Sequence, residues 1–142
     1  MSSLKTSAGE GAQAQTAAPS TGKLYEHVGM WSTYGPAGGQ VTVQMTIDGK
    51  IVRAEASGEI GQITLAMNAI NQLVGWTPRI HLWHPFACSE QHTAMADTTF
   101  IIKDGQNRMG SGHATHCDSA WSSVLAYIAA LNDYRAKHGP HQ

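Results

Sequence analysis

The sequence is poor in several residue types that mark particular classes of protein. Cys88 and Cys117 are its only cysteines. We expect both to be free thiols, since two cysteines do not make a disulfide framework in a protein of this size. Only nine Lys and Arg residues are present, they form no basic run, and the formal net charge is -1. This balance argues against a nucleic-acid partner.

Long apolar runs are also missing. No stretch approaches the roughly 20 apolar residues that a membrane-spanning helix needs. The N-terminal segment MSSLKTSAGEGAQAQ lacks the apolar core of a secretory signal. We therefore expect a cytoplasmic protein with no membrane partner. Its 142 residues fit one domain.

Composition divides the chain into four parts. Residues 1–23 are rich in Ala, Gly, Ser, Thr and Gln, with Leu4 as the only large apolar residue among the first 22. Such a segment buries too little apolar surface to offset its chain entropy, so we predict a disordered tail. Residues 24–39 carry several aromatic side chains before a Gly-rich run, and we interpret them as an arm or linker. Residues 40–135 are the predicted domain, and residues 136–142 a C-terminal tail.

The first half of the domain reads as a hairpin followed by a helix. Apolar and polar residues alternate from Val41 to Ile47, which predicts a half-buried strand. Asp48-Gly49 is a strong tight-turn signal before the return strand. A glycine-containing turn, Gly58–Gly61, precedes a helix that Gly75 and Pro78 end. Its predicted apolar stripe is Ile63, Ala66, Met67, Ile70, Leu73 and Val74.

The second half repeats this order. Residues 80–87 and 98–102 predict strands, and Asp104-Gly105 signals a second hairpin. The return strand ends in Gly110-Ser111-Gly112, which we interpret as the second glycine turn. A helix follows, with Asp118 as its expected N-cap, because a carboxylate there accepts the free amide hydrogens of the first turn. Its predicted buried stripe is Trp121, Val124, Leu125, Ile128 and Leu131.

The repeat predicts the fold class. We expect an α+β domain of two pseudo-symmetric β-hairpin-plus-helix repeats, with a sheet packed on two helices. Such a two-layer domain leaves a sheet face or edge to cover, so we also expect a homodimer. Each glycine turn exposes backbone amides beside the positive end of a helix, a setting that suits carboxylates and other anions.

The second repeat resembles the C-terminal regulatory domain of the 2-isopropylmalate synthase and citramalate synthase family. The resemblance rests on the spacing of the Gly110–Gly112 run, Asp118, Ser122–Val124, Ala126 and Ala130–Asn132. Gly58-Glu59 before an Ile/Leu-rich helix is similar to the family's first repeat, and about residues 40–133 are covered. The resemblance implies a dimerising domain that binds leucine or isoleucine near the two glycine turns at the dimer interface. Catalysis in that family belongs to a separate metal-dependent barrel, so we interpret this chain as a stand-alone copy of the regulatory domain.

Three segments depart from the family pattern, and all lie where the ligand would bind. The first turn is shortened to Gly58–Gln62, Trp83–Phe86 replaces an aromatic-Ser-Glu-His stretch, and His113–Cys117 is more polar than in the family. We therefore expect an amino acid or related small carboxylate without specifying leucine. A Trp83 wall would suit a larger or flatter ligand. The predicted ligand-binding residues are Gly58, Ile60, Trp83, Gly110, Gly112, His113, Thr115, His116 and Asp118.

Two other functions stay open. The first is a small enzyme that reuses the pocket for cyclisation, isomerisation or hydrolysis of a small metabolite. His113 or His116, paired with Asp118 or Asp97, would supply the acid and base; the competing role of Asp118 is the helix cap. The second is a structural partner of a larger complex that docks through residues 24–39.

Two groups of residues contain zinc-ligand types. One is His113, His116, Cys117 and Asp118; the other is His81, His84, Cys88 and His92. Neither has the spacing of a structural zinc site, and His81 and His84 point to opposite faces of a strand. We expect no metal and no cofactor, and interpret these histidines as partly exposed residues at strand ends and in loops.

Overall fold

The computed structural model describes residues 24–90 and 93–141 and contains two successive βββα units. The first unit comprises β2 (Tyr25–Gly35), β3 (Gly38–Ile47), β4 (Lys50–Gly58) and α1 (Gln62–Val74). The second comprises β5 (Arg79–Glu90), β6 (Thr93–Lys103), β7 (Met109–His116) and α2 (Ser119–His138). The predicted α+β class with two similar repeats is confirmed, although each repeat has three strands. The predicted tail, residues 1–23, lies outside the described residues.

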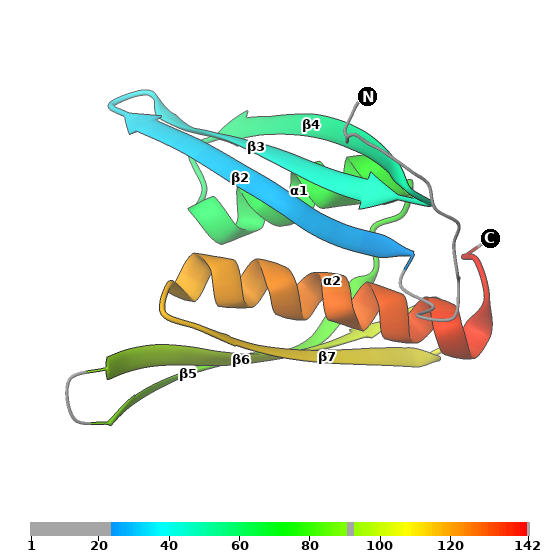
Figure 1. The fold of residues 1–142 in the computed structure, drawn as a ribbon. Coiled ribbons are helices and arrows are strands. Elements are labelled where there is room, and N and C mark those ends of the chain that lie inside the picture. The colour runs from blue at the N-terminus through cyan, green and yellow to red at the C-terminus, as the bar shows by residue number, and fades with distance from the viewer. Residues whose placement is uncertain (1–23, 91–92, 142) are drawn as a thin grey trace.

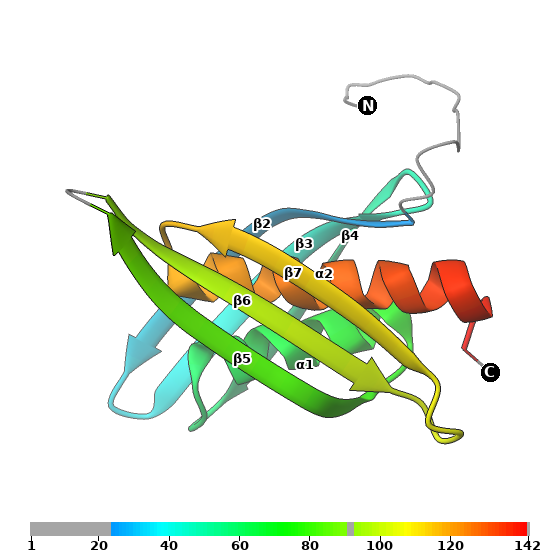
Figure 2. The same cartoon turned by 90° about the horizontal axis from the view of Figure 1, so that it is seen from below.

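The two helices lie between two antiparallel sheets (Figure 1). The strand orders are β2-β3-β4 and β5-β6-β7. Helix α1 packs on β3 and β4, whereas α2 packs on β6 and β7 and also contacts α1 and β2. Both helices begin at the same end of the molecule (Figure 2). The molecule therefore has one end that gathers helix N-termini and another that gathers helix C-termini.

Strand β3 supplies the centre of the first sheet, as its alternation predicts. Val41, Val43 and Met45 are fully buried, while the residues between them face outward. Asp48 and Gly49 both have positive φ (53° and 81°), the conformation of the tight hairpin turn expected there. The shared core also takes in buried residues from β6 and both helices, chiefly Leu65, Ala69, Ile70, Phe100, Ile102, Val124, Tyr127, Ile128 and Leu131.

Residues 24–39 differ from the predicted arm or linker. Most of them form β2, an edge strand that pairs with β3. The pairing runs from Tyr25 opposite Ile47 to Gly35 opposite Gly38. Alternation is hard to see in this strand because Trp31 and Tyr34 are both exposed and a bulge interrupts the register near His27. The glycine-rich run is the tight connection to β3. At the other end of β2, the amide and carbonyl of Tyr25 bond to the Asn132 side chain at 2.9 and 2.8 Å.

Helix α1 ends at Gly75 as predicted, with the Gly75 amide bonded to the Asn71 carbonyl. Helix α2 continues through His138, so the predicted C-terminal tail begins three residues later than expected. Val124, Ile128 and Leu131 of the predicted stripe are buried, whereas Trp121 and Leu125 are only half-buried. Other positions of α2 are buried as well, because the helix touches both sheets and α1. Buried residues beyond the stripe include Ala120, Ser122, Ser123, Ala126, Tyr127, Ala130 and Tyr134.

The second hairpin forms where Asp104-Gly105 predicts one, but its turn spans Asp104–Arg108. The buried Asp104 carboxylate accepts bonds from the amides of Gln106 and Arg108, the Arg108 guanidinium and the Tyr134 hydroxyl. Burial alone would raise the pKa of Asp104, but these hydrogen bonds hold it well below its usual range. A buried carboxylate therefore organises the loop and ties it to α2.

Candidate functional site

The N-terminus of α1 has backbone amides that no described side chain caps. Gly61 occupies the N-cap position with extended dihedral angles, and the first turn has no acidic residue. The first amides of a helix have no partner within the helix and carry a partial positive charge. The predicted site residues Gly58 and Ile60 precede this turn, and Ile60 is 45% exposed. An open donor group thus lies beside an exposed apolar side chain.

The N-terminus of α2 is closed by the chain's own carboxylate. Asp118 accepts hydrogen bonds from the amides of Ala120 (2.8 Å) and Trp121 (3.0 Å), which confirms the predicted cap. His116 Nδ1 accepts from the Asp118 amide at 2.9 Å, and its ring stacks on Trp121. The two helix starts are therefore chemically different, although the sequence suggests two equivalent turns.

Gly110 and Gly112 lie inside β7 rather than in a turn, which corrects the predicted position of the second glycine turn. A Cβ atom at either position would come closer than 3.0 Å to backbone atoms of α2, from Ala130 at Gly110 and from Ala126 and Ala130 at Gly112. These glycines let the helix approach the strand closely, and α2 fills the space on that side. The turn itself is Cys117–Asp118, after β7 ends at His116.

His113 lies on the sheet face that points away from α2. Its Nε2 contacts the Asp97 carboxylate, and the Thr115 hydroxyl donates to the same Asp97 oxygen at 3.3 Å. His116 points to the opposite face of the strand and Asp118 caps α2, so His113, His116 and Asp118 do not converge in this chain. Of the acid–base pairs considered from the sequence, only His113–Asp97 is formed.

Trp83 lies on the edge strand β5, on the side facing α2. Its indole N–H donates to the Ser123 hydroxyl at 3.3 Å, and its ring lies near that of Phe100. The side chain is nevertheless 44% exposed. Trp83 is thus held in a fixed position with much of its surface accessible, and its role in lining a ligand pocket stays a prediction.

The described residues include no group of three His, Cys, Asp or Glu side chains arranged to hold a metal ion. Cys117 is exposed and its sulfur lies 3.8 Å from His116 Nδ1. The side chain of Cys88 and all of His92 lie outside the described part.

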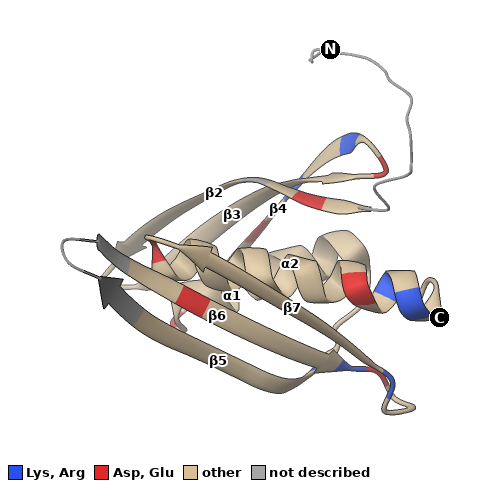
Figure 3. Cartoon of the chain, turned by 60° about the horizontal axis from the view of Figure 1, so that its bottom comes forward, with Lys and Arg blue, Asp and Glu red and all other residues tan. Residues whose placement is uncertain are grey.

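Charged residues are sparse and of mixed sign along the elements (Figure 3). No helix in the described ranges is long and apolar enough to cross a membrane.

His27 is a functional candidate that no sequence motif marks, because its partners are distant in the chain. It belongs to β2, and its ring lies edge-on to Trp121 of α2 with ring centroids 4.5 Å apart. Both ring nitrogens are buried without a hydrogen-bond partner in the described structure. Burial lowers the pKa of His27 to about 4. The local sequence does not indicate its inward position, because the β-bulge beside it interrupts the alternation of buried and exposed residues.

Comparison with known proteins gives one consistent family. The family model described as the LeuA allosteric (dimerisation) domain matches residues 30–135. The chain is 29% identical over 103 residues to the 2-isopropylmalate synthase of Caulobacter sp. (strain K31), covering 72% of this chain and 19% of that protein. It is 31% identical over 100 residues to that of Methylobacterium nodulans, covering 70% and 18%. The similarity thus spans about a fifth of each relative. This chain belongs to the LeuA allosteric (dimerisation) domain family.

Proposed function

We propose that this chain is a regulatory dimerisation module, acting in the cytoplasm, that binds an amino acid or related small carboxylate at the start of α1. The observation that carries the proposal is the uncapped α1 N-terminus beside the Gly58–Gly61 turn. A ligand carboxylate would accept the free amides that Asp118 satisfies in α2. Ile60 and Trp83 would offer apolar surface to the rest of the ligand.

Dimerisation is proposed from family membership and from exposed apolar surface. Leu82 and Phe86 on β5 are 41% and 57% exposed, and β5 is the edge strand of its sheet. Covering such an edge with a second copy removes its unpaired backbone groups from water. Light scattering at micromolar concentration tests this, and a monomer would contradict it.

A designed cap tests the ligand site directly. Gly61 has φ -65° and ψ 158°, and a Cβ there meets no atom within 4 Å, so other residues fit. Gly61→Asp places a carboxylate on the α1 amides and should block a ligand carboxylate. Gly61→Ala is the matched control, because it adds a side chain without an acceptor.

Thermal unfolding with a panel of branched-chain and aromatic amino acids, 2-oxo acids and 2-hydroxy acids gives the readout. A ligand at 100 times its dissociation constant should add about 2.7 kcal/mol of stability. We expect the shift in the natural chain and in Gly61→Ala, and its loss in Gly61→Asp. An equal shift of the unfolding temperature in Gly61→Asp, or no shift with any compound, would contradict the proposal.

The alternative proposal, a small acid–base enzyme, now depends on His113 and Asp97. Their contact pairs an imidazole with a carboxylate that can set its tautomer. The test is exchange of substrate carbon-bound hydrogen in D₂O, followed by NMR over the same panel. Exchange that disappears in His113→Gln and persists in His116→Gln would support this function, whereas identical exchange in all three chains would exclude it.

A further inference from the structure

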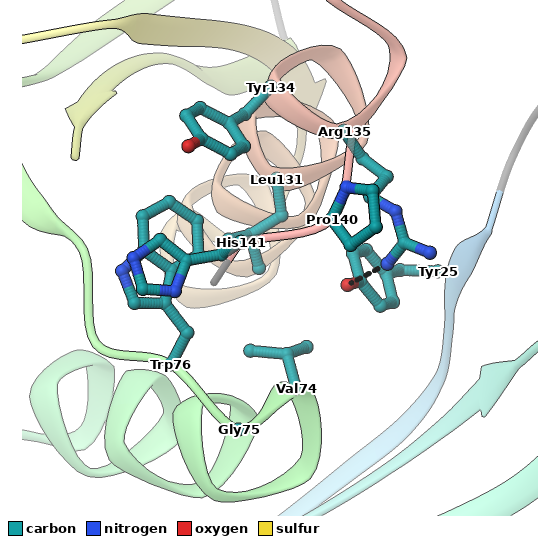
Figure 4. Close-up of a pocket in the computed structure, with 9 residues that line it drawn as sticks. All are labelled: Tyr25, Val74, Gly75, Trp76, Leu131, Tyr134, Arg135, Pro140 and His141. Atoms are coloured by element: carbon teal, nitrogen blue, oxygen red, sulfur yellow. Dashed lines mark hydrogen bonds between the residues drawn. The ribbon is translucent and has the colours of Figure 1, made fainter. Parts of the chain in front are cut away.

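A partly open cavity lies at the opposite end of the helix pair, where both helices finish. It has a volume of about 70 Å³ and is formed by the ends of α1 and α2, the start of β2 and the segment after α2 (Figure 4). Because both helices run in the same direction, this cavity lies far from the α1 N-terminus. It is therefore separate from the ligand site proposed above.

Apolar and aromatic side chains make most of the cavity wall. Val74 from α1 and Leu131 from α2 point toward one another across it (Figure 4). Tyr25, Trp76 and Tyr134 add aromatic surface. Such a lining suits a compact apolar group, as ligand pockets are mostly apolar with a few placed polar groups.

A short strap covers one side of this space. α2 ends at His138, the C-cap residue Gly139 has a φ of 77°, and Pro140 and His141 then line the cavity. The His141 imidazole stacks on the Trp76 indole with centroids 4.2 Å apart and planes 12° apart. The strap is thus a short exposed segment held against the wall by ring stacking.

The charged groups around the cavity favour a ligand with both signs of charge. Arg135 carries the permanent charge of the lining, and one of its N–H groups donates to the Tyr25 hydroxyl at 3.2 Å. None of the nine described lining residues carries a carboxylate. The carbonyl ends of α1 and α2, in contrast, carry partial negative charge and favour a cation. The Arg135 guanidinium would attract a carboxylate, and the helix C-termini would attract an ammonium. The lining therefore suits one small molecule that carries both groups.

We propose that this cavity is a second small-molecule site, for an α-amino acid with a compact aliphatic side chain. Arg135 would bind the carboxylate, the side chain would lie between Val74 and Leu131, and the ammonium would face the helix carbonyl ends. The strap at residues 139–141 would open for entry and close over the ligand.

The 142-residue chain can report on both sites at once in ¹H–¹⁵N NMR spectra. The chain has four Trp residues, and each contributes one indole N–H signal. Trp76 lines this cavity, whereas Trp83 lies at the other end, and single Trp→Phe variants assign the signals. Three probes are compared. Valine carries both charged groups, isovalerate carries only the carboxylate, and isobutylamine carries only the ammonium.

We expect valine to move the Trp76 signal saturably, with at least tenfold weaker effects from the two single-charge probes. Arg135→Met keeps the aliphatic stem and should weaken valine binding at least tenfold. Lys137→Met is its control, since Lys137 is on the same helical turn, pairs with Asp133 and does not line the cavity. Gly61→Asp should leave the Trp76 response unchanged.

Several outcomes would overturn this inference. A Trp76 signal that valine does not move, equal responses to valine and isovalerate, or unchanged binding in Arg135→Met would each do so. Loss of the Trp76 response in Gly61→Asp would assign all binding to the α1 site instead. Because Arg135→Met removes a bond to Tyr25, Arg135→Lys serves as a second variant; its retained charge should restore part of the affinity.

Discussion

Tyr127 of α2 donates a hydrogen bond from its phenol to the side-chain carbonyl of Asn71 in α1, over 2.6 Å. Tyr127 is fully buried, and burial raises the pKa of its phenol. Tyr127→Phe keeps the ring and leaves Asn71 without this donor, so we expect a loss of about 1 kcal/mol in urea unfolding. Tyr34→Phe, at a 52% exposed ring, is the control. Equal stability of the two variants would show that this bond contributes nothing.

The close approach of α2 to β7 predicts a large effect of one methyl group. Gly112→Ala would place Cβ against the backbone of Ala126 and Ala130, and backbone atoms cannot move aside cheaply. We expect about 1–3 kcal/mol of destabilisation, the usual range for overpacking. Gly61→Ala, in open space, should change stability far less. A Gly112→Ala protein as stable as Gly61→Ala would contradict the packing role.

The Asp118 cap gives a prediction with a conservative rescue. Asp118→Ala removes the acceptor for the Ala120 and Trp121 amides and should cost about 1 kcal/mol of unfolding free energy. Asp118→Asn keeps a side-chain oxygen and should retain most of the stability. Chemical denaturation of the two variants checks this, and equal losses would show that charge, not the hydrogen bonds, matters.

His27 predicts a pH-dependent part of stability. Its pKa of about 4 in the folded chain is below its ordinary value, so the unfolded chain binds the proton first as pH falls. The contribution of neutral His27 is therefore complete above its ordinary pKa and is lost as pH decreases toward 4.

His27→Phe preserves a ring against Trp121 and removes this titration. We expect the free energy of unfolding of the natural chain, relative to that of His27→Phe, to decrease between about pH 7.5 and about pH 4.5 in denaturation series. Parallel pH profiles for the two chains would refute the assignment.

The sequence predicts the elements after residue 40 well wherever the local signals are strong. Asp48-Gly49, Gly75 and Asp118 do in the fold what their chemistry indicates, because turns and caps depend on near neighbours. The sequence does not predict the strand at residues 25–35, because Trp31 and Tyr34 are both exposed and a bulge near His27 breaks the alternation.

The candidate site was less predictable because it depends on strand register and on helix ends. His113 and His116 are three residues apart, which on a strand places them on opposite faces, and only the β6–β7 register brings Asp97 to His113. Gly110 and Gly112 resemble a loop in sequence, yet they lie in a strand, where their lack of a side chain lets α2 pack closely on β7. The unequal capping of the two helices becomes apparent only once Gly61 is seen at the start of α1.

The bonds between Asn132 and the Tyr25 backbone join residues 107 positions apart and connect the last helix to the first described strand. The two repeats are consequently not separable modules: α2 needs a partner from the beginning of the chain. Cutting the connection after Gly75 should yield two fragments that are each unfolded alone and regain structure on mixing. Because contacts this distant form only after costly loop closure, the intact chain should fold as one cooperative unit and more slowly than a helical bundle of its size.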